Sequence, residues 1–385
     1  MKNKNFRFSN TGNAFLCAFA AYYAVSIIYQ LVFTVIYKST SAWPPVVVWC
    51  EYILNPVAFV STVLIYSKCK NVDVVSATKL DKKLNLKQVG ILALLSVCCI
   101  MAFLPISNIF LDLLSRMGFS MELNFADTNA SVGAYFLGLL TMALLPAFSE
   151  EFLMRGMVLN AAEQKRDFSY AILITAGMFS LMHGNPIQTV HQFFLGAVLA
   201  YVVLVSRSLW AGVLLHFFNN FLSLSLDYPV SKFFEITGMY DMHPALWYLI
   251  WIVAILLGCT LVVYLLKKFT SVSVPAKPAL SETNEIVDVY ENKDGVFTTD
   301  APLGKKVEKQ RGDFVNAFKS ITGLFKKNGF KNAYKKINVI IGDIVPCDDE
   351  VREMTREDFF PSNIKLVFII LGIIWVLSLI SGFLL

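Results

Sequence analysis

Long apolar segments are the feature that most constrains how this chain folds. A helix needs about 20 mainly apolar residues to cross the hydrocarbon core of a membrane. By that measure the sequence predicts nine spans, near residues 14–37, 43–66, 88–110, 132–162, 168–183, 187–206, 208–225, 245–266 and 364–385. The first of these is too long for the apolar part of a signal peptide, so we interpret it as an uncleaved membrane helix. The expected fold is an all-α, polytopic transmembrane helix bundle, with about 8 core spans and one extra C-terminal span.

The composition excludes an ordinary soluble protein. Hydrophobic residues make up 56% of the 385 residues and charged residues only 16%, whereas about a quarter of the residues of a soluble protein are charged. The net charge of +5 does not indicate nucleic acid, because the lysines lie in loops between apolar segments and set the membrane orientation there. The seven cysteines include no Cys-x-x-Cys pair, which favours neither a disulfide framework nor a zinc ribbon.

Lysine and arginine in the loops predict the orientation, because cytoplasmic loops carry an excess of both. The N-terminus and the loop near 67–87 are rich in lysine, while the predicted outer loops hold only Lys38, Arg116 and Lys232. We therefore expect an integral membrane protein, of the bacterial cytoplasmic membrane. Its N-terminus and residues 267–363 would be cytoplasmic and its C-terminus would lie outside.

Residues 267–363 differ from the rest in being rich in Lys, Asp, Glu, Asn and Ser. We divide the chain into a transmembrane core at 1–270, with polar motifs at 133–224, a cytoplasmic charged segment at 271–362 and a C-terminal transmembrane helix at 363–385. Within the charged segment, residues 273–304 are typical of a flexible linker. The basic stretch 313–337 has helical spacing of Phe and Ile, and predicts either a helix on an anionic membrane surface or a solvated helix.

Ionisable side chains inside apolar helices cost about 3 kcal/mol or more each, so they are candidates for function. In the segment 149–155, Glu151 and Arg155 lie four residues apart in the order that favours an ion pair. Glu150 points about 100° away on a helix and is left without that partner, so it can take and return a proton. The alternative is that the helix ends near Phe148 and both acids are solvated.

Two further polar clusters lie on later helices. Phe179 and His183 share a helical face, so that the phenyl ring can restrict the imidazole. His216 and Asn220 are also four apart, and together they can donate two hydrogen bonds to one oxyanion. A helix rises 1.5 Å per residue, so Glu150 and His183 lie roughly 21 and 22 Å from the cytoplasmic ends of their helices, and His216 lies roughly 13 Å from the end of its own. The matching depths favour a long fourth helix over solvated acids.

These motifs, in this order, resemble those of the CPBP intramembrane proteases: Glu-Glu-x-x-x-Arg, Phe-x-x-x-His and His-x-x-x-Asn, each on its own helix. That family includes the type II CAAX prenyl endopeptidases and the bacterial Abi proteins, some of them tied to bacteriocin self-immunity. The resemblance covers about 133–224 and implies an endopeptidase in which an activated water attacks a peptide bond. By this resemblance the catalytic residues are Glu150, His183, His216 and Asn220, and the supporting residues are Glu151, Arg155 and Phe179.

The family is often labelled metallo-, yet this chain has no His-Glu-x-x-His motif. Glu150, His183 and His216 are the three ligands that a zinc ion would use, leaving one open position. The same groups suffice for a glutamate mechanism that requires no cofactor, and we favour that mechanism over one with Zn²⁺.

The expected substrate is a peptide or protein tail delivered at the membrane, and we do not expect CAAX cleavage. One alternative is a non-catalytic regulator that binds a sensor kinase or transporter, with partner docking through 271–362. An ion-coupled transporter is a second alternative, but it would show paired halves with broken helices. Among the other polar residues, Glu51 either lines the cavity or anchors its helix at the interface, and we assign His191 polar packing or substrate contact.

Overall fold

The computed structural model describes residues 6, 8–38, 44–120, 128–163, 168–273 and 362–384, and every regular element within these ranges is a helix. Eight helices are long and apolar enough to cross a membrane. They are α1 (Phe8–Tyr37), α2 (Pro45–Cys69), α4 (Leu86–Arg116), the run Val132–Glu163, α9 (Pro186–Ser206), α10 (Leu209–Thr237), α11 (Pro244–Ser273) and α15 (Ser362–Leu384). The predicted polytopic helix bundle is confirmed.

A ninth apolar helix, α8 (Phe168–Met182), has only 15 residues. Most of its residues are buried by other helices, so its length is set by the protein around it more than by the membrane. The predicted linker, the predicted basic helix and the loop residues Lys165 and Arg166 lie outside the described residues.

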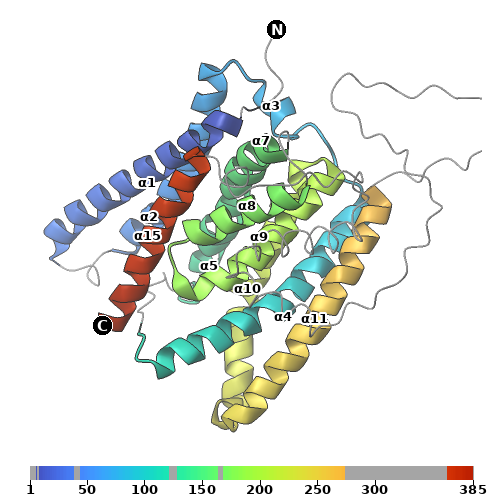
Figure 1. Ribbon diagram of the computed structural model, residues 1–385. Helices are drawn as coiled ribbons and strands as arrows, with labels where there is room; N and C mark the ends of the chain where they lie inside the picture. The colour runs from blue at the N-terminus through green and yellow to red at the C-terminus, as the bar shows by residue number, and fades with distance from the viewer. Residues whose placement is uncertain are drawn as a thin grey trace, which may run out of the picture. The chain divides into compact units, whose positions relative to one another are not determined.

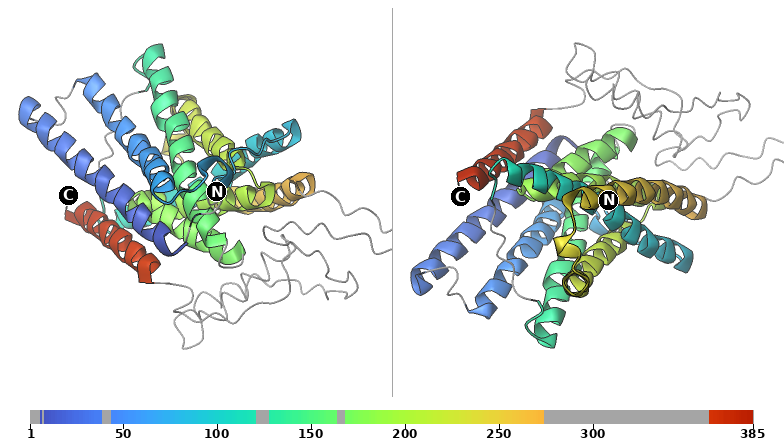
Figure 2. Two further views of the ribbon diagram at one scale, coloured as in Figure 1. Left: turned by 90° about the horizontal axis from the view of Figure 1, so that it is seen from above. Right: turned by 90° about the horizontal axis from the view of Figure 1, so that it is seen from below.

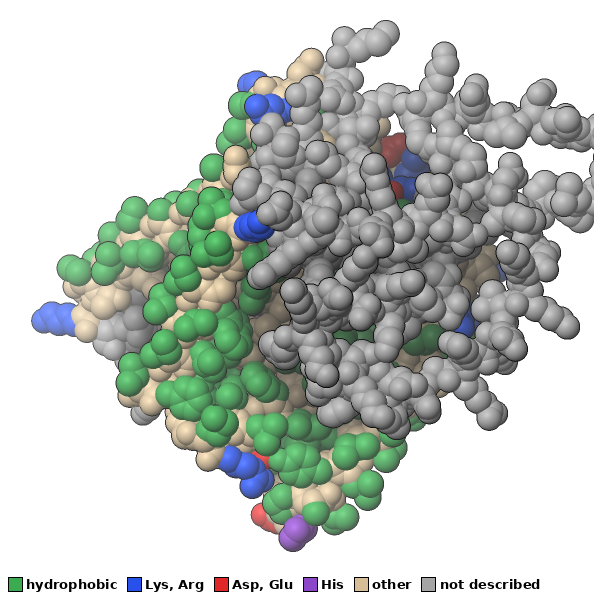
Figure 3. Space-filling view, in the orientation of Figure 1, with side chains coloured by type: hydrophobic (Ala, Val, Ile, Leu, Met, Phe, Trp, Pro, Cys, Tyr) green, Lys and Arg blue, Asp and Glu red, His purple; other side chains and the backbone are tan. Residues whose placement is uncertain are grey.

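The helices α8, α9 and α10 form the centre of the bundle (Figure 1). On one side lie α1, α2 and α15, and on the other side α4 packs along α11; the two further views in Figure 2 agree with this arrangement. The α4–α11 packing is close, because a Cβ added to Gly258 would lie 2.7 Å from the backbone nitrogen of Ala102. On the face that Figure 3 shows, hydrophobic side chains cover the visible parts of the described helices and Lys and Arg lie near the helix ends, as a lipid environment requires.

The run Val132–Glu163 is one continuous helix in which two π-helical segments interrupt the α-helix. It consists of α5 (Val132–Gly138), the π-helical η2 (Leu139–Leu144), α6 (Leu145–Glu151), the π-helical η3 (Phe152–Leu159) and α7 (Asn160–Glu163). The helix does not end near Phe148, and Glu150 and Glu151 are only 7% and 0% exposed. The long fourth helix is thus confirmed against the solvated alternative, although it is not a regular α-helix. Stretches of π-helix occur frequently at functional sites.

Polar contacts gather the ends of several helices at one side of the bundle. The ammonium group of Lys79 lies 2.7 Å from the carboxylate of Glu163, which also pairs with Arg207. Burial lowers the pKa of Lys79, and the Glu163 carboxylate opposes that shift. The indole of Trp210 donates to the carbonyl of Leu80 at 3.0 Å. The C-terminal ends of the fourth helix and of α9 therefore meet the loop before α4. Because successive spans run in opposite directions across the membrane, all three are expected on the same side.

Candidate active site

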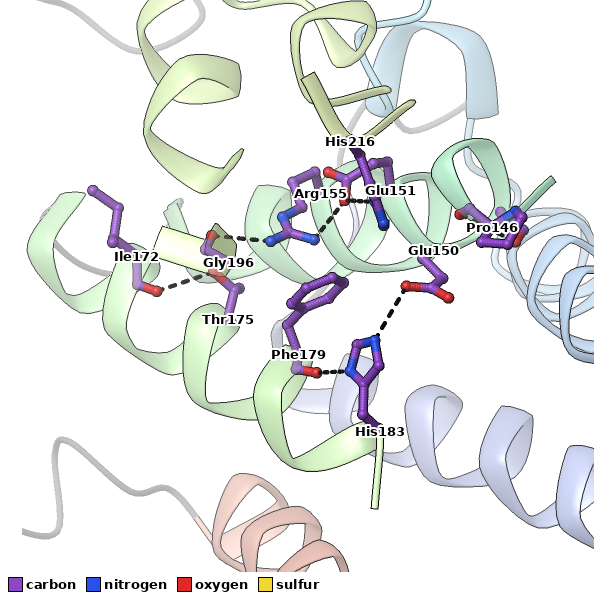
Figure 4. A network of polar contacts seen from close by, with 11 residues as sticks. Pro146, Glu150, Glu151, Arg155, Ile172, Thr175, Phe179, His183, Gly196 and His216 are labelled. Carbon is purple, nitrogen blue, oxygen red and sulfur yellow. Dashed lines mark hydrogen bonds and ion pairs between the residues drawn. The ribbon is translucent and has the colours of Figure 1, made fainter. Parts of the chain in front are cut away.

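Glu150 and His183 come from different helices and face each other inside the bundle (Figure 4). Glu150 lies near the end of α6, and His183 directly follows α8. The Oε2 atom of Glu150 is 3.9 Å from the Nε2 atom of His183. This oxygen is buried, and no hydrogen bond to another described residue satisfies it. The two groups that matching depths predict to meet are thus neighbours.

A backbone hydrogen bond determines which nitrogen of His183 faces the carboxylate. The Nδ1 atom lies 2.8 Å from the carbonyl oxygen of Phe179. A carbonyl can only accept, so Nδ1 carries the proton, and in the neutral ring Nε2 keeps a lone pair. The pair therefore presents a carboxylate oxygen and a ring nitrogen toward the same space.

Glu151 is as deeply buried as its neighbour, but it has charged partners. Its Oε1 atom accepts from Arg155 at 2.7 Å, and both side chains are 0% exposed. The same oxygen lies 3.0 Å from Nδ1 of His216. Arg155 also donates to the carbonyl of Gly196 at 2.9 Å. The ion pair predicted from the spacing is confirmed, and the contact with His216 extends it to a third helix.

Phe179 lies at the centre of these groups. Its ring centroid is 5.0 Å from that of His183 and 5.7 Å from that of His216, in edge-to-face arrangements. The guanidinium carbon of Arg155 lies 4.3 Å from the same ring centroid. The predicted packing of Phe179 on His183 is confirmed, and the ring also separates the Glu150–His183 pair from the buried ion pair.

His216 and Asn220 lie four residues apart on α10, as predicted, but both already make hydrogen bonds within the protein. His216 uses Nδ1 toward Glu151, and Asn220 donates from Nδ2 to the carbonyl of Met142 in η2 at 3.3 Å. The groups that remain for a ligand are Nε2 of His216 and the second N–H of Asn220. An oxyanion role for this pair stays a prediction.

Two glycines complete the site, and the sequence argument did not single them out. A Cβ added to Gly212 would lie 2.7 Å from Oε2 of Glu151, and one added to Gly196 would lie 3.1 Å from Cδ1 of Phe179. Gly212 lies one helical turn before His216, on the same face of the helix. A glycine at that spacing from a motif histidine is the sequence pattern that could have identified Gly212 as part of the site.

The proposed zinc ligands lie in the same region of the bundle. The described part of the chain holds no group of three or more His, Cys, Asp or Glu side chains arranged to bind a metal ion. Glu150 and His183 lie 3.9 Å apart, and His216 directs Nδ1 at Glu151, which leaves its Nε2 for a ligand. The zinc site and the mechanism that requires no cofactor both stay predictions.

The remaining candidate, Glu51 on α2, lies half-buried against α1. Its carboxylate accepts from Nε2 of Gln30 at 2.7 Å and from the hydroxyl of Ser26 at 3.5 Å. Glu51 therefore links two helices, and none of its described contacts is to the motif residues.

Comparison with known proteins agrees with this geometry. Residues 132–222 match the family model described as type II CAAX prenyl endopeptidase Rce1-like, within the CPBP family. No curated protein and no solved structure matches the chain. The matched segment contains all three motifs, and the resemblance to the CPBP proteases is confirmed. This chain therefore carries a type II CAAX prenyl endopeptidase Rce1-like domain at residues 132–222.

Proposed function

We propose that the protein is an intramembrane endopeptidase that hydrolyses a peptide bond of a membrane-delivered peptide or protein tail. The observation that carries the proposal is the approach of Glu150 and His183 to 3.9 Å inside the helix bundle. That distance is too long for a direct hydrogen bond, but it suits a water molecule bound to both groups. The Rce1-like domain supports intramembrane protease activity in general.

In this mechanism Glu150 acts as the general base. It takes a proton from the water that it shares with His183, and the water oxygen attacks the scissile carbonyl carbon. The C–N bond then breaks, and the proton held by Glu150 passes to the leaving amine, which restores the carboxylate. The Nδ1–H bond to Phe179 fixes the ring of His183 with Nε2 toward the water.

The tetrahedral oxyanion is stabilised by His216 and Asn220. Because Nδ1 of His216 faces the Glu151 carboxylate, Nε2 can donate to the oxyanion only when the ring is protonated. Glu151 holds Nδ1 of His216, and Arg155 pairs with the same carboxylate. Glu151, Arg155 and Phe179 thus act as supporting residues, and no step requires a cofactor.

The substrate class follows from the location of the site. A centre built from buried residues of membrane helices acts on segments that enter the bilayer. We propose membrane-delivered peptides and protein tails in general as the substrates, and we do not expect CAAX cleavage. We place the N-terminus and 267–363 in the cytoplasm, the side of the lysine-rich loops.

The test compares wild type with Glu150→Gln at equal abundance in cells that otherwise lack the protein. Peptide ends in membranes and medium are quantified by mass spectrometry. We expect Glu150→Gln to lower specific ends by about 100-fold or more, because a general base contributes that much, and to let their precursors accumulate. Purified wild-type protein in lipid nanodiscs should then cleave a synthetic copy of an affected precursor.

The control is Glu235→Gln, the same change at an exposed position on α10. It should leave every peptide end at its wild-type level. If Glu150→Gln leaves the peptide inventory unchanged while it still rescues the phenotype of cells lacking the protein, the enzymatic proposal is wrong. Deletion of 271–362 should then abolish the rescue, as a regulator that binds a sensor kinase or transporter through this segment requires.

A further inference from the structure

The second turn of α9 carries two buried polar atoms that the mechanism does not use. Oε1 of Gln192 and Nδ1 of His191 are inaccessible to solvent and make no hydrogen bond to any described residue. Leaving such a group unpaired costs about 1–3 kcal/mol, so buried polar groups nearly always have a partner. The missing partner of these two side chains is therefore expected to be a ligand.

Contacts between α8 and α9 show where Gln192 lies. The hydroxyl of Ser180 donates to the carbonyl of Thr189 at 2.6 Å. Farther along α9, Gly196 lies against the ring of Phe179. Gln192 lies between these two contact points and shares a helix face with Gly196, four residues away. This register places Gln192 at the level of Phe179 and of the turn that follows it.

His191 lies beside the same centre. Its electrostatic neighbours are His183 and His216, the histidines of the two motif helices. Its ring packs edge-on against Phe103 of α4, with centroids 6.4 Å apart. The helix that carries both side chains, α9, packs beside the motif residues, because its Gly196 contacts Phe179 and accepts from Arg155, and α9 contributes no residue to the three motifs.

The chemistry of a substrate inside the bilayer explains what these atoms are for. A peptide bond is accessible to attack only when its segment is extended, and an extended segment in an apolar environment has unpaired N–H and C=O groups. A glutamine amide can accept from one backbone N–H and donate to a neighbouring C=O. The ring nitrogen of His191 adds a second acceptor.

We propose that Gln192 and His191 bind the backbone of the substrate beside the scissile bond, in an inference that rests on the proposed protease function. The ligand is an extended peptide segment, recognised through its N–H and C=O groups. Because these contacts are to the backbone, they select conformation and fix which bond reaches Glu150. They do not select a particular side chain.

The test uses two substitutions of Gln192. A packing role and a role in binding the substrate backbone predict opposite orders for the activities of the two variants. Gln192→Met keeps the length of the side chain but removes the acceptor oxygen, whereas Gln192→Glu keeps an acceptor oxygen and adds a group that is costly to bury. Both variants, with wild type and Glu150→Gln, are expressed at equal membrane abundance. The peptide ends that depend on Glu150 are then quantified.

We expect Gln192→Met to lower these ends about tenfold, the equivalent of one lost hydrogen bond, and to spread cleavage over neighbouring bonds. Gln192→Glu, which keeps the acceptor oxygen but loses the amide N–H, should yield more of these ends than Gln192→Met and keep the original bond. His191→Phe, which preserves the aromatic packing on Phe103, should also spread the cleavage positions.

The inference is overturned if Gln192→Met cleaves as wild type does, or if activity follows only the amount of folded protein with unchanged cleavage positions. In both cases the ends still disappear in Glu150→Gln, so the protease function stands. If no peptide end depends on Glu150, the proposed function fails, and this inference fails with it.

Discussion

Adjacent residues of identical chemistry have opposite environments in this site. Glu150 and Glu151 are both buried, yet Glu151 holds Arg155 and His216, while Oε2 of Glu150 has no hydrogen-bond partner among the described residues. A carboxylate held in an ion pair is a poor base, whereas a buried carboxylate without an ion pair that faces an imidazole can exchange a proton. This difference supports the proposal that Glu150 is the base and Glu151 a supporting residue.

A first prediction at this scale concerns the buried ion pair. Arg155→Met leaves Glu151 as an uncompensated buried charge, so it should lower the free energy of unfolding by about 3–5 kcal/mol. The control is Arg116→Met, because Arg116 forms the same type of i,i+4 pair with Asp112 at 2.8 Å but is largely exposed. Arg116→Met should change stability little. Equal effects of the two substitutions, in unfolding measured in detergent micelles, would contradict the assignment.

At the scale of elements, the site depends on how closely and at what rotation the helices pack. The fourth helix changes to π-helix on both sides of α6. Each extra residue in a turn rotates all later side chains by about 100°. On the facing helix α10, Gly212 lets the backbone approach Glu151, so that His216 one turn later reaches the same carboxylate.

We therefore predict that Gly212→Ala disturbs the site by overpacking. The added Cβ would lie 2.7 Å from Oε2 of Glu151 and 2.9 Å from Cγ2 of Val203. It should cost about 1–3 kcal/mol of stability and lower Glu150-dependent cleavage by more than the loss of folded protein explains. Gly90→Ala on α4 is the control, because a Cβ there meets nothing within 4 Å. A Gly212→Ala variant as active and stable as Gly90→Ala would refute close packing as the requirement.

At the scale of the whole molecule, segments far apart in sequence enclose the centre. The C-terminal helix α15 packs against α1 and α8, and its Trp375 donates to the hydroxyl of Thr189 at 2.7 Å. The described helices form one compact unit with the Rce1-like domain inside it. The domain thus holds the three motifs, and helices outside the match pack around it.

The expected orientation gives a prediction at this scale. In a variant whose only cysteine is Cys69, at the end of α2, a membrane-impermeant maleimide should not react in intact cells and should react after permeabilisation. In a second variant, a single cysteine is introduced as Lys232→Cys, near the C-terminal end of α10. This cysteine should react with the maleimide in intact cells. The reverse pattern of labelling would show that the orientation is inverted.

The sequence by itself determined that the chain is a helical membrane protein, which motifs it carries, and that Glu151 pairs with Arg155. These conclusions depend on local quantities, namely the length of apolar segments and the spacing of side chains on one helix. The meeting of Glu150 with His183 could be predicted as a matter of depth, because helical rise per residue is constant.

Only the tertiary structure decided that His216 turns to Glu151, that Phe179 contacts three motif side chains, and that Arg155 reaches the backbone of Gly196. Such contacts depend on the rotation of each helix about its axis and on the distance between helix axes. The π-helical turns shift that rotation, and glycines at contact points set that distance. Neither quantity can be obtained from the spacing along a single helix, because both arise from packing between segments distant in the chain.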